Sequence, residues 1–458
     1  MMSDSIAAIS TPLGEGGISV IRVSGMEAIS TVDKLFRAQT KLSKAASHTV
    51  HYGHIVDGND RVIEEVLVTI MKSPRSYTME DVVEIGCHGG MVAVKQVLDL
   101  LLEQPHIRLA EPGEFTKRAF LNGRIDLSQA EAVIDLIRSK SDRAFSVALK
   151  QVEGTLSKRV ANLREQLVGL MAHIEVNIDY PEHDVEEMTN RFIEEESQAV
   201  IDELNDLLRT AEQGKILREG IETVIVGRPN VGKSSLLNAL ARQNRAIVTD
   251  IPGTTRDVIE EYINVGGIPL KLSDTAGLRE TEDVVEQIGV ERSKAAFLAA
   301  DLILIVFSAS TPLSEDEREL LNALNDRPTI AIINKVDLPM QIEKEELARW
   351  LPKDRIINMS LKQDLGVDQL EQVLTSIFFS GEMESHDLTY VSNARHIAEL
   401  KKAKTNLQEA ISATEMGIPI DMIQIDVRSA WEHLGEIIGD TVSDTLIDQI
   451  FSRFCLGK

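Results

Sequence analysis

Cysteine is scarce in this chain. Only Cys87 and Cys455 occur among its 458 residues, and they lie far apart in the sequence. Two distant cysteines provide no disulfide framework, and so few thiols are typical of proteins that fold in a reducing compartment. We therefore expect a cytoplasmic protein.

Long apolar runs are also missing. The most apolar stretch, residues 298–307, has the length of a strand and is interrupted by Asp301. A membrane-spanning helix needs roughly 20 apolar residues. Residues 1–21 carry Asp4 and Glu15 and lack the basic start and apolar run of a secretory signal. We expect neither a signal peptide nor a membrane partner.

Basic side chains are outnumbered by acidic ones. The chain has 73 Asp and Glu against 48 Lys and Arg, which gives a formal net charge of -25. Such a charge repels polyanions at long range, so any contact with nucleic acid must be local. The remaining composition, 43% hydrophobic and 26% charged, is that of a folded globular protein. The length exceeds what one hydrophobic core serves, and we expect several domains.

The pattern of apolar residues changes along the chain. Residues 6–122 hold short apolar runs of strand length and one helix-like stretch at 92–102, which predicts an α+β domain. Beyond Leu127 glycine and proline become rare and apolar residues recur at helical spacing. From 222 to 379 strands alternate with helices, which indicates a parallel sheet, and the helical pattern then returns. We therefore expect a multidomain fold with an α+β domain at 1–122, a discontinuous all-α domain at 123–218 plus 380–458, and an inserted α/β domain at 219–379.

A phosphate-binding loop is predicted at residues 227–234, which read GRPNVGKS. An apolar strand precedes this motif and a helical run at 236–241 follows it, as the motif requires. Its glycines let backbone N–H groups curve around phosphates at a helix N-terminus. Lys233 would contact the β- and γ-phosphates, and the Ser234 hydroxyl would ligate Mg²⁺.

Two further segments complete the phosphate side of the predicted site. Residues 274–277, with the sequence DTAG, end the next apolar strand. Asp274 can hold the water shell of Mg²⁺, and the Gly277 backbone can approach the γ-phosphate. The second hydroxyl for the metal would come from Thr254 or Thr255.

The base is predicted from residues 334–337, which read NKVD after a buried strand. The carboxylate of Asp337 can accept hydrogen bonds from guanine N1–H and from the N2 amino group. Adenine lacks that pattern of donors and would leave polar groups unpaired, so the motif favours GTP over ATP. Ser360 lies in a later loop that can support the base.

The group that orients the hydrolytic water is not fixed by these motifs. Leu278 follows Gly277 where Ras-type GTPases carry a glutamine, and its apolar side chain cannot orient water. The acidic residues of the following segment remain open as candidates: Glu280, Glu282, Asp283, Glu286 and Glu291.

Over its whole length the chain closely resembles the MnmE (TrmE) family of tRNA wobble-uridine modification GTPases. Besides the GTPase motifs, three blocks carry the resemblance: TPLGEGGI at 11–18, PGEFTKRAFLNG at 112–123 and FCLGK at 454–458. Three departures stand beside them: Leu361 and Pro252 each occupy a position where the family usually has alanine, and Cys87, for which we expect a packing role, precedes His-Gly-Gly.

The resemblance implies a K⁺-dependent GTPase that acts as a homodimer with an MnmG-type FAD-dependent flavoprotein, in a heterotetramer or larger complex. The pair would add a carboxymethylaminomethyl or aminomethyl group at C5 of uridine 34 in certain tRNAs. The N-terminal domain would bind the one-carbon donor, 5-formyltetrahydrofolate or a related reduced folate. The alternative is a regulatory GTPase switch in ribosome assembly or signalling that performs no modification chemistry and binds no folate.

The resemblance also implies roles for individual residues outside the base motif. Folate contacts fall on Arg22, Glu84, Arg124 and Lys458, and cations suit the tail carboxylates of such a ligand. Cys455 would take part in the uridine chemistry, since a thiolate can add to a pyrimidine ring. Its alternative role is packing.

At the nucleotide, the resemblance implies a K⁺ site formed by Asn230, Thr249, Ile251 and Thr254. It assigns Thr255 to Mg²⁺ beside Ser234, with Asp274 acting through the water shell, and it assigns Glu286 to the hydrolytic water. The full set expected to bind GTP comprises Asn230, Val231, Gly232, Lys233, Ser234, Ser235, Thr249, Asp250, Ile251, Pro252, Gly253, Thr254, Thr255, Asp274, Thr275, Ala276, Gly277, Asn334, Lys335 and Asp337.

Overall fold

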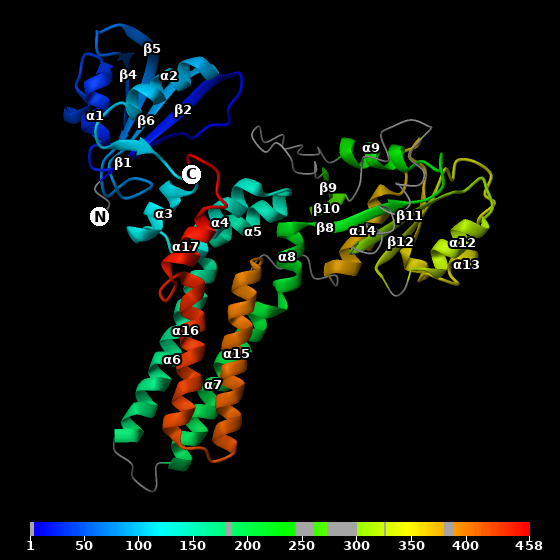
Figure 1. The fold of residues 1–458 in the computed structure, drawn as a ribbon. Helices are drawn as coiled ribbons and strands as arrows, with labels where there is room; N and C mark the ends of the chain where they lie inside the picture. Colours follow the sequence, from blue (N-terminus) through cyan, green and yellow to red (C-terminus); the bar gives the residue numbers. More distant parts are fainter. Residues whose placement is uncertain (1–3, 180–185, 244–260, 273–299, 325–326, 380–388) are drawn as a thin grey trace.

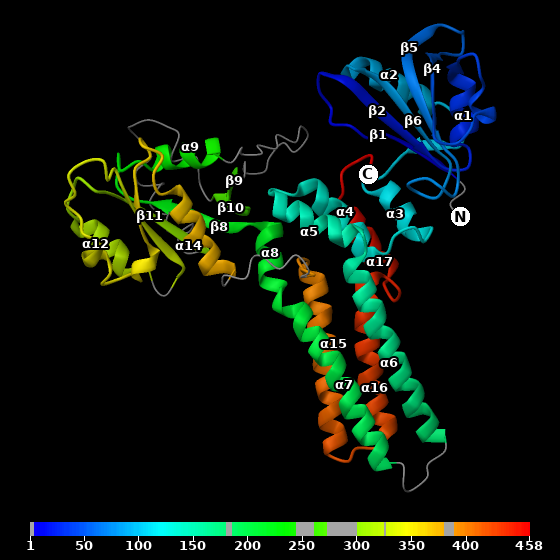
Figure 2. The ribbon, with the colours of Figure 1, turned by 180° about the vertical axis from the view of Figure 1, so that it is seen from behind.

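The computed structural model describes residues 4–179, 186–243, 261–272, 300–324, 327–379 and 389–458. Its fold is multidomain: an N-terminal sheet domain, a bundle of long helices and an α/β domain lie at three separate corners of the molecule (Figure 1). The C-terminus returns to the N-terminal domain, which the reverse view also shows (Figure 2). The expected fold class is confirmed.

The N-terminal domain is built on a seven-stranded mixed sheet in the order β3-β4-β5-β6-β2-β1-β7. Helices α1 and α2 pack on one face, where Val32 and Leu101 join the sheet residues Val23 and Ile85 in one buried core. The elements are β1 (Ser5–Ile9), β2 (Gly16–Ser24), α1 (Ala28–Leu35), β3 (Phe36–Arg37), the 3₁₀ turn η1 (Leu42–Lys44), β4 (Thr49–Val56), β5 (Val62–Met71), β6 (Val82–Gly89), α2 (Met91–Leu102), β7 (Ile107–Leu109) and α3 (Glu114–Leu121).

The prediction of a single helix in this region was wrong. Helix α2 lies where the apolar spacing indicated it, but α1 and α3 are also present. Both have only eight residues. A short helix is marginal by itself and forms because tertiary packing covers its apolar face, so its local pattern is weak. In α3 that packing comes from two sides, because Phe115 joins the sheet domain and Phe120 packs against helices α4 and α17.

The helical part assembles from two distant stretches of sequence. Its long helices α6, α7, α15 and α16 run side by side in one bundle (Figures 1 and 2). Leu163 and Leu167 of the earlier stretch are buried with Leu407 and Leu434 of the later one. The elements are α4 (Leu127–Arg138), α5 (Asp142–Val152), α6 (Thr155–Asp179), α7 (Glu186–Arg209), α8 (Ala211–Glu219), α15 (Ala394–Glu415), α16 (Ile420–Ile438) and α17 (Asp444–Phe451).

Within the described ranges, none of the helices combines the length and apolarity needed to cross a bilayer. Helix α6 extends to Asp179, the last residue described before the gap at 180–185.

The α/β domain is inserted between α8 and α15 and contains a six-stranded sheet in the order β13-β12-β11-β8-β10-β9. Strand β9 runs antiparallel to β10, which corrects the expectation of a purely parallel sheet. The reason is local, because Gly266 and Gly267 both have positive φ and close a tight hairpin. The elements are β8 (Ile221–Val226), α9 (Lys233–Gln243), β9 (Glu261–Val265), β10 (Ile268–Leu272), β11 (Leu302–Ser308), α12 (Glu315–Asn322), β12 (Thr329–Asn334), α13 (Lys344–Leu347), the 3₁₀ turn η2 (Lys353–Arg355), β13 (Ile356–Met359) and α14 (Val367–Phe379).

Candidate nucleotide and cofactor sites

The predicted phosphate loop lies between the end of β8 and the start of α9, at the carboxyl edge of the parallel strands. Gly227 has φ +147°, and a Cβ there would lie 2.3 Å from the Val306 carbonyl oxygen. Gly232 has φ +109°, and a Cβ there would lie 2.2 Å from Asn334 Nδ2. Only glycine fits either position, so the loop backbone is held close to its neighbours with its N–H groups available to an anion.

Lys233 is the first residue of α9 and folds back across the loop. Its Nζ donates hydrogen bonds to the carbonyl oxygens of Gly227 at 2.7 Å and Arg228 at 2.8 Å. Burial lowers the pKa of this ammonium group. Ser234 and Ser235 are exposed in the next positions of the helix. The arrangement places a cation and hydroxyl groups at a helix N-terminus, which suits a phosphate with a bound metal.

The base motif is tied to the phosphate loop by two hydrogen bonds. Asn334, at the end of β12, donates from Nδ2 to the Val231 carbonyl at 2.9 Å. The Nζ of Lys335 donates to the Asn230 carbonyl at 2.6 Å. Asn230 and Lys335 both adopt positive φ. Residues that are about a hundred positions apart in sequence therefore form one continuous surface.

Asp337 is exposed at the end of this surface. The buried Ser360 donates from its hydroxyl to Asp337 Oδ1 at 2.7 Å, and this hydrogen bond is the main cause that lowers the pKa of the carboxyl group. Ser360 therefore fixes the orientation of the Asp337 carboxylate. Leu361, one of the departures noted above, packs against the core of the α/β domain.

Several predicted residues lie outside the described part of the chain, so the structure places none of them: Thr249, Asp250, Ile251, Pro252, Gly253, Thr254, Thr255, Asp274, Thr275, Ala276, Gly277 and Glu286.

A second cluster lies in the N-terminal domain. Arg22 on β2 and Glu84 on β6 face each other in register, with Arg22 Nη2 2.8 Å from Glu84 Oε1. The Arg22 guanidinium lies 5.5 Å from the centre of the Tyr77 ring and 5.6 Å from that of Phe115. Arg124 covers the Tyr77 ring as well, at 4.8 Å, and donates to the Tyr77 carbonyl oxygen. Cationic and aromatic groups that suit a flat anionic ligand are thus gathered together.

The last residues of the chain enter this cluster. The backbone N–H of Phe115 donates to the Lys458 carbonyl at 3.2 Å, and that of Gly113 donates to the Cys455 carbonyl at 3.4 Å. Gly457 has φ +85°, and a Cβ there would lie 2.4 Å from the Ile9 carbonyl oxygen. Burial lowers the pKa of Lys458, and the neighbouring charge of Arg22 adds to the effect. Lys458 therefore lies beside Arg22 although the two stand at opposite ends of the sequence.

The two cysteines differ sharply in environment. Cys455 is exposed next to this cluster. Cys87 is buried in the sheet core, where burial raises the pKa of its thiol to about 12. The packing role expected for Cys87 agrees with this position. The sequence did not indicate that Tyr77 lies between Arg22 and Arg124, because an aromatic residue far from both in sequence shows no pattern that places it beside them.

Comparisons with known proteins cover almost the whole chain. Residues 5–124 match the family described as the GTP-binding protein TrmE N-terminus, and residues 127–455 match the MnmE helical domain. The tRNA modification GTPase MnmE of Geobacillus kaustophilus is 58% identical over 459 residues, which cover 99% of either chain. The protein of the same description from Bacillus subtilis is 58% identical over 459 residues, which cover 99% of this chain and 100% of that one.

Proposed function

The chain belongs to the MnmE family of tRNA modification GTPases, and we propose that it couples K⁺-dependent GTP hydrolysis to the modification of uridine 34. Its GTP-derived conformational change would serve the addition of a carboxymethylaminomethyl or aminomethyl group at C5 of that base. A reduced folate would supply the one-carbon unit, and an MnmG-type flavoprotein would share the chemistry.

The nucleotide part of the proposal assigns a task to each group of the loop. Lys233 pairs with the phosphates, since its ammonium already contacts the carbonyl oxygens that rim the loop. Asp337, held as an ionised acceptor by Ser360, selects guanine. Ser234 and Asn230 are exposed where they can hold Mg²⁺ and K⁺ respectively. Bound cations would offset the charge that develops on the transferred phosphoryl group.

The folate part of the proposal rests on the cluster around Arg22. A reduced folate carries a flat ring system and a tail of carboxylates. Arg124 and Lys458 are further cations near Arg22, and Glu84 is a hydrogen-bond acceptor at its side. We assign ring contacts to Glu84 and carboxylate contacts to the cations. Cys455 stands exposed at the edge of the same cluster and is assigned the contact with the uridine ring.

The homodimer is assigned to the exposed face of the N-terminal sheet, opposite the face that α1 and α2 pack against. Tyr52 on β4 pairs in register with Leu67 on β5, and Leu67 pairs with Gly86 on β6. A Cβ on Gly86 would lie 3.8 Å from Ile18 and 3.9 Å from Leu67, so these side chains adjoin. Tyr52, Leu67 and Ile18 are 60%, 50% and 65% exposed. A contiguous apolar patch on a sheet suits a self-complementary contact with a second copy of the chain.

The observation that carries the proposal is the meeting of Lys458 and Cys455 with Arg22 and Glu84, since a GTPase switch has no need of this second site. The test is U34 analysis in tRNA from cells that lack the chain. Wild type should restore the modification, and Arg22→Ala should not. Arg37→Ala, which breaks an exposed Arg37–Asp60 ion pair in the same domain, is the matched control and should restore it.

Normal U34 in the deleted cells would contradict the proposal. Calorimetry of the purified chain then separates the alternatives. Reduced folate should bind to the wild type and bind at least about tenfold more weakly to Arg22→Ala, because one charged contact is lost. Intact GTP binding without any folate binding would favour the regulatory switch.

A further inference from the structure

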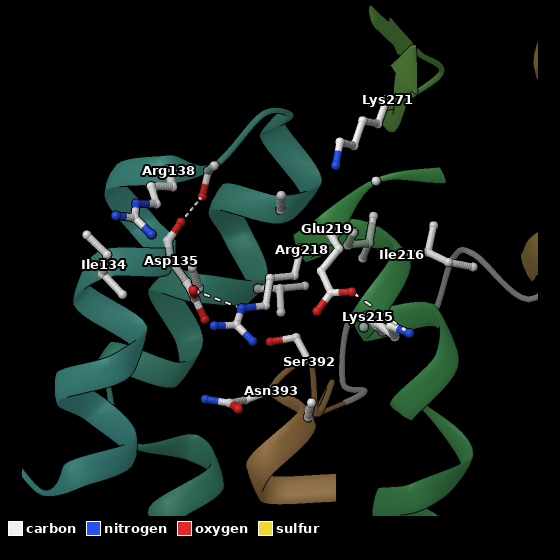
Figure 3. Close-up of a pocket in the computed structure, with 18 of the residues that line it drawn as sticks. Ile134, Asp135, Arg138, Lys215, Ile216, Arg218, Glu219, Lys271, Ser392 and Asn393 are labelled. Atoms are coloured by element: carbon white, nitrogen blue, oxygen red, sulfur yellow. Dashed lines mark hydrogen bonds and ion pairs between the residues drawn. The ribbon is translucent and has the colours of Figure 1, made fainter. Parts of the chain in front are cut away.

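A cleft of about 1320 Å³ lies where the helical part meets the α/β domain. Helices α4, α5 and α8 contribute to its walls, and Figure 3 shows Asp135, Arg138 and Arg218 around it. These charged residues belong neither to the nucleotide site nor to the cluster around Arg22. They lie between the two sites.

The first link runs from the phosphate loop to α8. Strand β8 ends in that loop, and at its other end only Gly220 separates β8 from α8. Gly220 has φ +83°, and its N–H donates to the Ile216 carbonyl, so it closes the helix without a flexible connection. The connection between β8 and α8 is therefore a single residue long.

The second link runs from α8 to α4. Arg218 Nε lies 2.9 Å from Asp135 Oδ1, and Figure 3 shows the guanidinium directed at that carboxylate. The Asp135 side chain is only 12% exposed. An ion pair with so little contact to water holds its geometry more firmly than one on the open surface. Asp135 is thus a contact through which α8 acts on α4.

The third link runs from α4 to the segment that carries Cys455. Arg138 Nη2 donates to the Arg453 carbonyl at 2.8 Å, two residues before Cys455. Ile134 packs in one buried cluster with Phe454, the residue that follows Arg453 in the sequence. Asp135 and Arg138 stand one turn apart on the same helix. Helix α4 therefore contacts both α8, which leads into the nucleotide domain, and the segment that carries Cys455.

We propose that Asp135 and Arg138 are positioning residues that link the orientation of the GTPase domain to the placement of Cys455. The proposal rests on the function proposed above, in which Cys455 meets the uridine while GTP is hydrolysed elsewhere. The nucleotide state would change the orientation of β8, and Arg218, Asp135, Arg138 and Arg453 would transmit that change to Cys455.

The test measures alkylation of Cys455 by iodoacetamide in the full-length protein, with the modified peptide identified by mass spectrometry. Cys87 is buried and should react far more slowly. In the wild type, the rate with a non-hydrolysable GTP analogue and K⁺ should differ from the rate with GDP by at least about 5-fold, the lower end of allosteric couplings. Asp135→Asn should bring this ratio close to 1 while GTP turnover stays within about twofold.

Three further variants sharpen the result. Arg138→Gln should also bring the ratio of the two alkylation rates close to 1. The double variant should change this ratio no further than either single variant does, because the links act in series. Arg159→Gln breaks a surface ion pair with Glu203 in the bundle and should keep the wild-type ratio. If Asp135→Asn does not fold, Arg138→Gln, which changes an exposed side chain, decides the question.

An unchanged ratio in Asp135→Asn or Arg138→Gln would overturn the proposal, as would a wild type without any nucleotide dependence. Alkylation requires neither tRNA nor folate. A failure of the U34 function therefore shows itself in the modification analysis, whereas a failure of the coupling shows itself in the alkylation ratio.

Discussion

Replacement of Gly232 by alanine should weaken GTP binding, because the phosphate loop has no room for a side chain at this position. At φ +109° a side chain is strained by about 1–2 kcal/mol. The added Cβ would lie 2.2 Å from Asn334 Nδ2, which must move and give up its hydrogen bond to the Val231 carbonyl. Loss of a buried hydrogen bond costs about 1–3 kcal/mol. The sum is about 2–5 kcal/mol. If this cost falls on the nucleotide-binding conformation of the loop, the affinity for GTP falls roughly 30-fold to a few thousand-fold.

The assay is a fluorescence titration with a labelled GTP analogue, accompanied by urea unfolding to verify that the variant is folded. Gly169→Ala is the matched control, because a Cβ there meets nothing within 4 Å and Gly169 lies inside helix α6. That substitution should leave GTP affinity unchanged and raise stability by up to about 1 kcal/mol. A folded Gly232→Ala protein that binds GTP within about threefold of the wild type would refute the reasoning.

Three further predictions concern other parts of the molecule. Asp337→Asn replaces one of the two acceptor oxygens by an NH2 donor, so GTP should bind at least about 100-fold more weakly and xanthosine triphosphate should become the better ligand. A titration with both nucleotides checks this, and retained GTP preference would contradict it. Burial alone would raise the pKa of Glu131, but His396 and Arg395 together hold it well below its usual range. Glu131 therefore stabilises the fold at pH values above its unfolded pKa of about 4.3 and loses this contribution as the pH falls. Glu131→Gln should lower the free energy of unfolding by about 3–5 kcal/mol at pH 7. In urea unfolding, the difference from the wild type should narrow below about pH 5. Leu67→Asp should convert the proposed homodimer to a monomer in sedimentation, whereas Val92→Asp, at a 73% exposed position on α2, should not.

The nucleotide domain could be predicted from the sequence in considerable detail. Its motifs follow buried strands directly, and neighbouring residues set the register between strand, loop and helix. The motifs GRPNVGKS and NKVD could therefore be placed in the fold from the sequence. The prediction failed where the result depended on contacts between distant segments. The sequence did not indicate that Asn334 and Lys335 hold the loop at Val231 and Asn230, about a hundred positions earlier.

By itself the sequence determined which motifs the chain carries: a phosphate-loop motif, the NKVD motif and a terminal block with a cysteine. Only the tertiary structure decided where these groups meet. Arg22 and Lys458 come together because the chain returns to its first domain after the helical bundle. Asp135 meets Arg218 because the packing of the helical part brings α4 and α8 to the same cleft, next to the α/β domain. Local patterns reflect interactions between near neighbours, whereas such meetings depend on the packing of whole helices and sheets, which no short segment encodes alone.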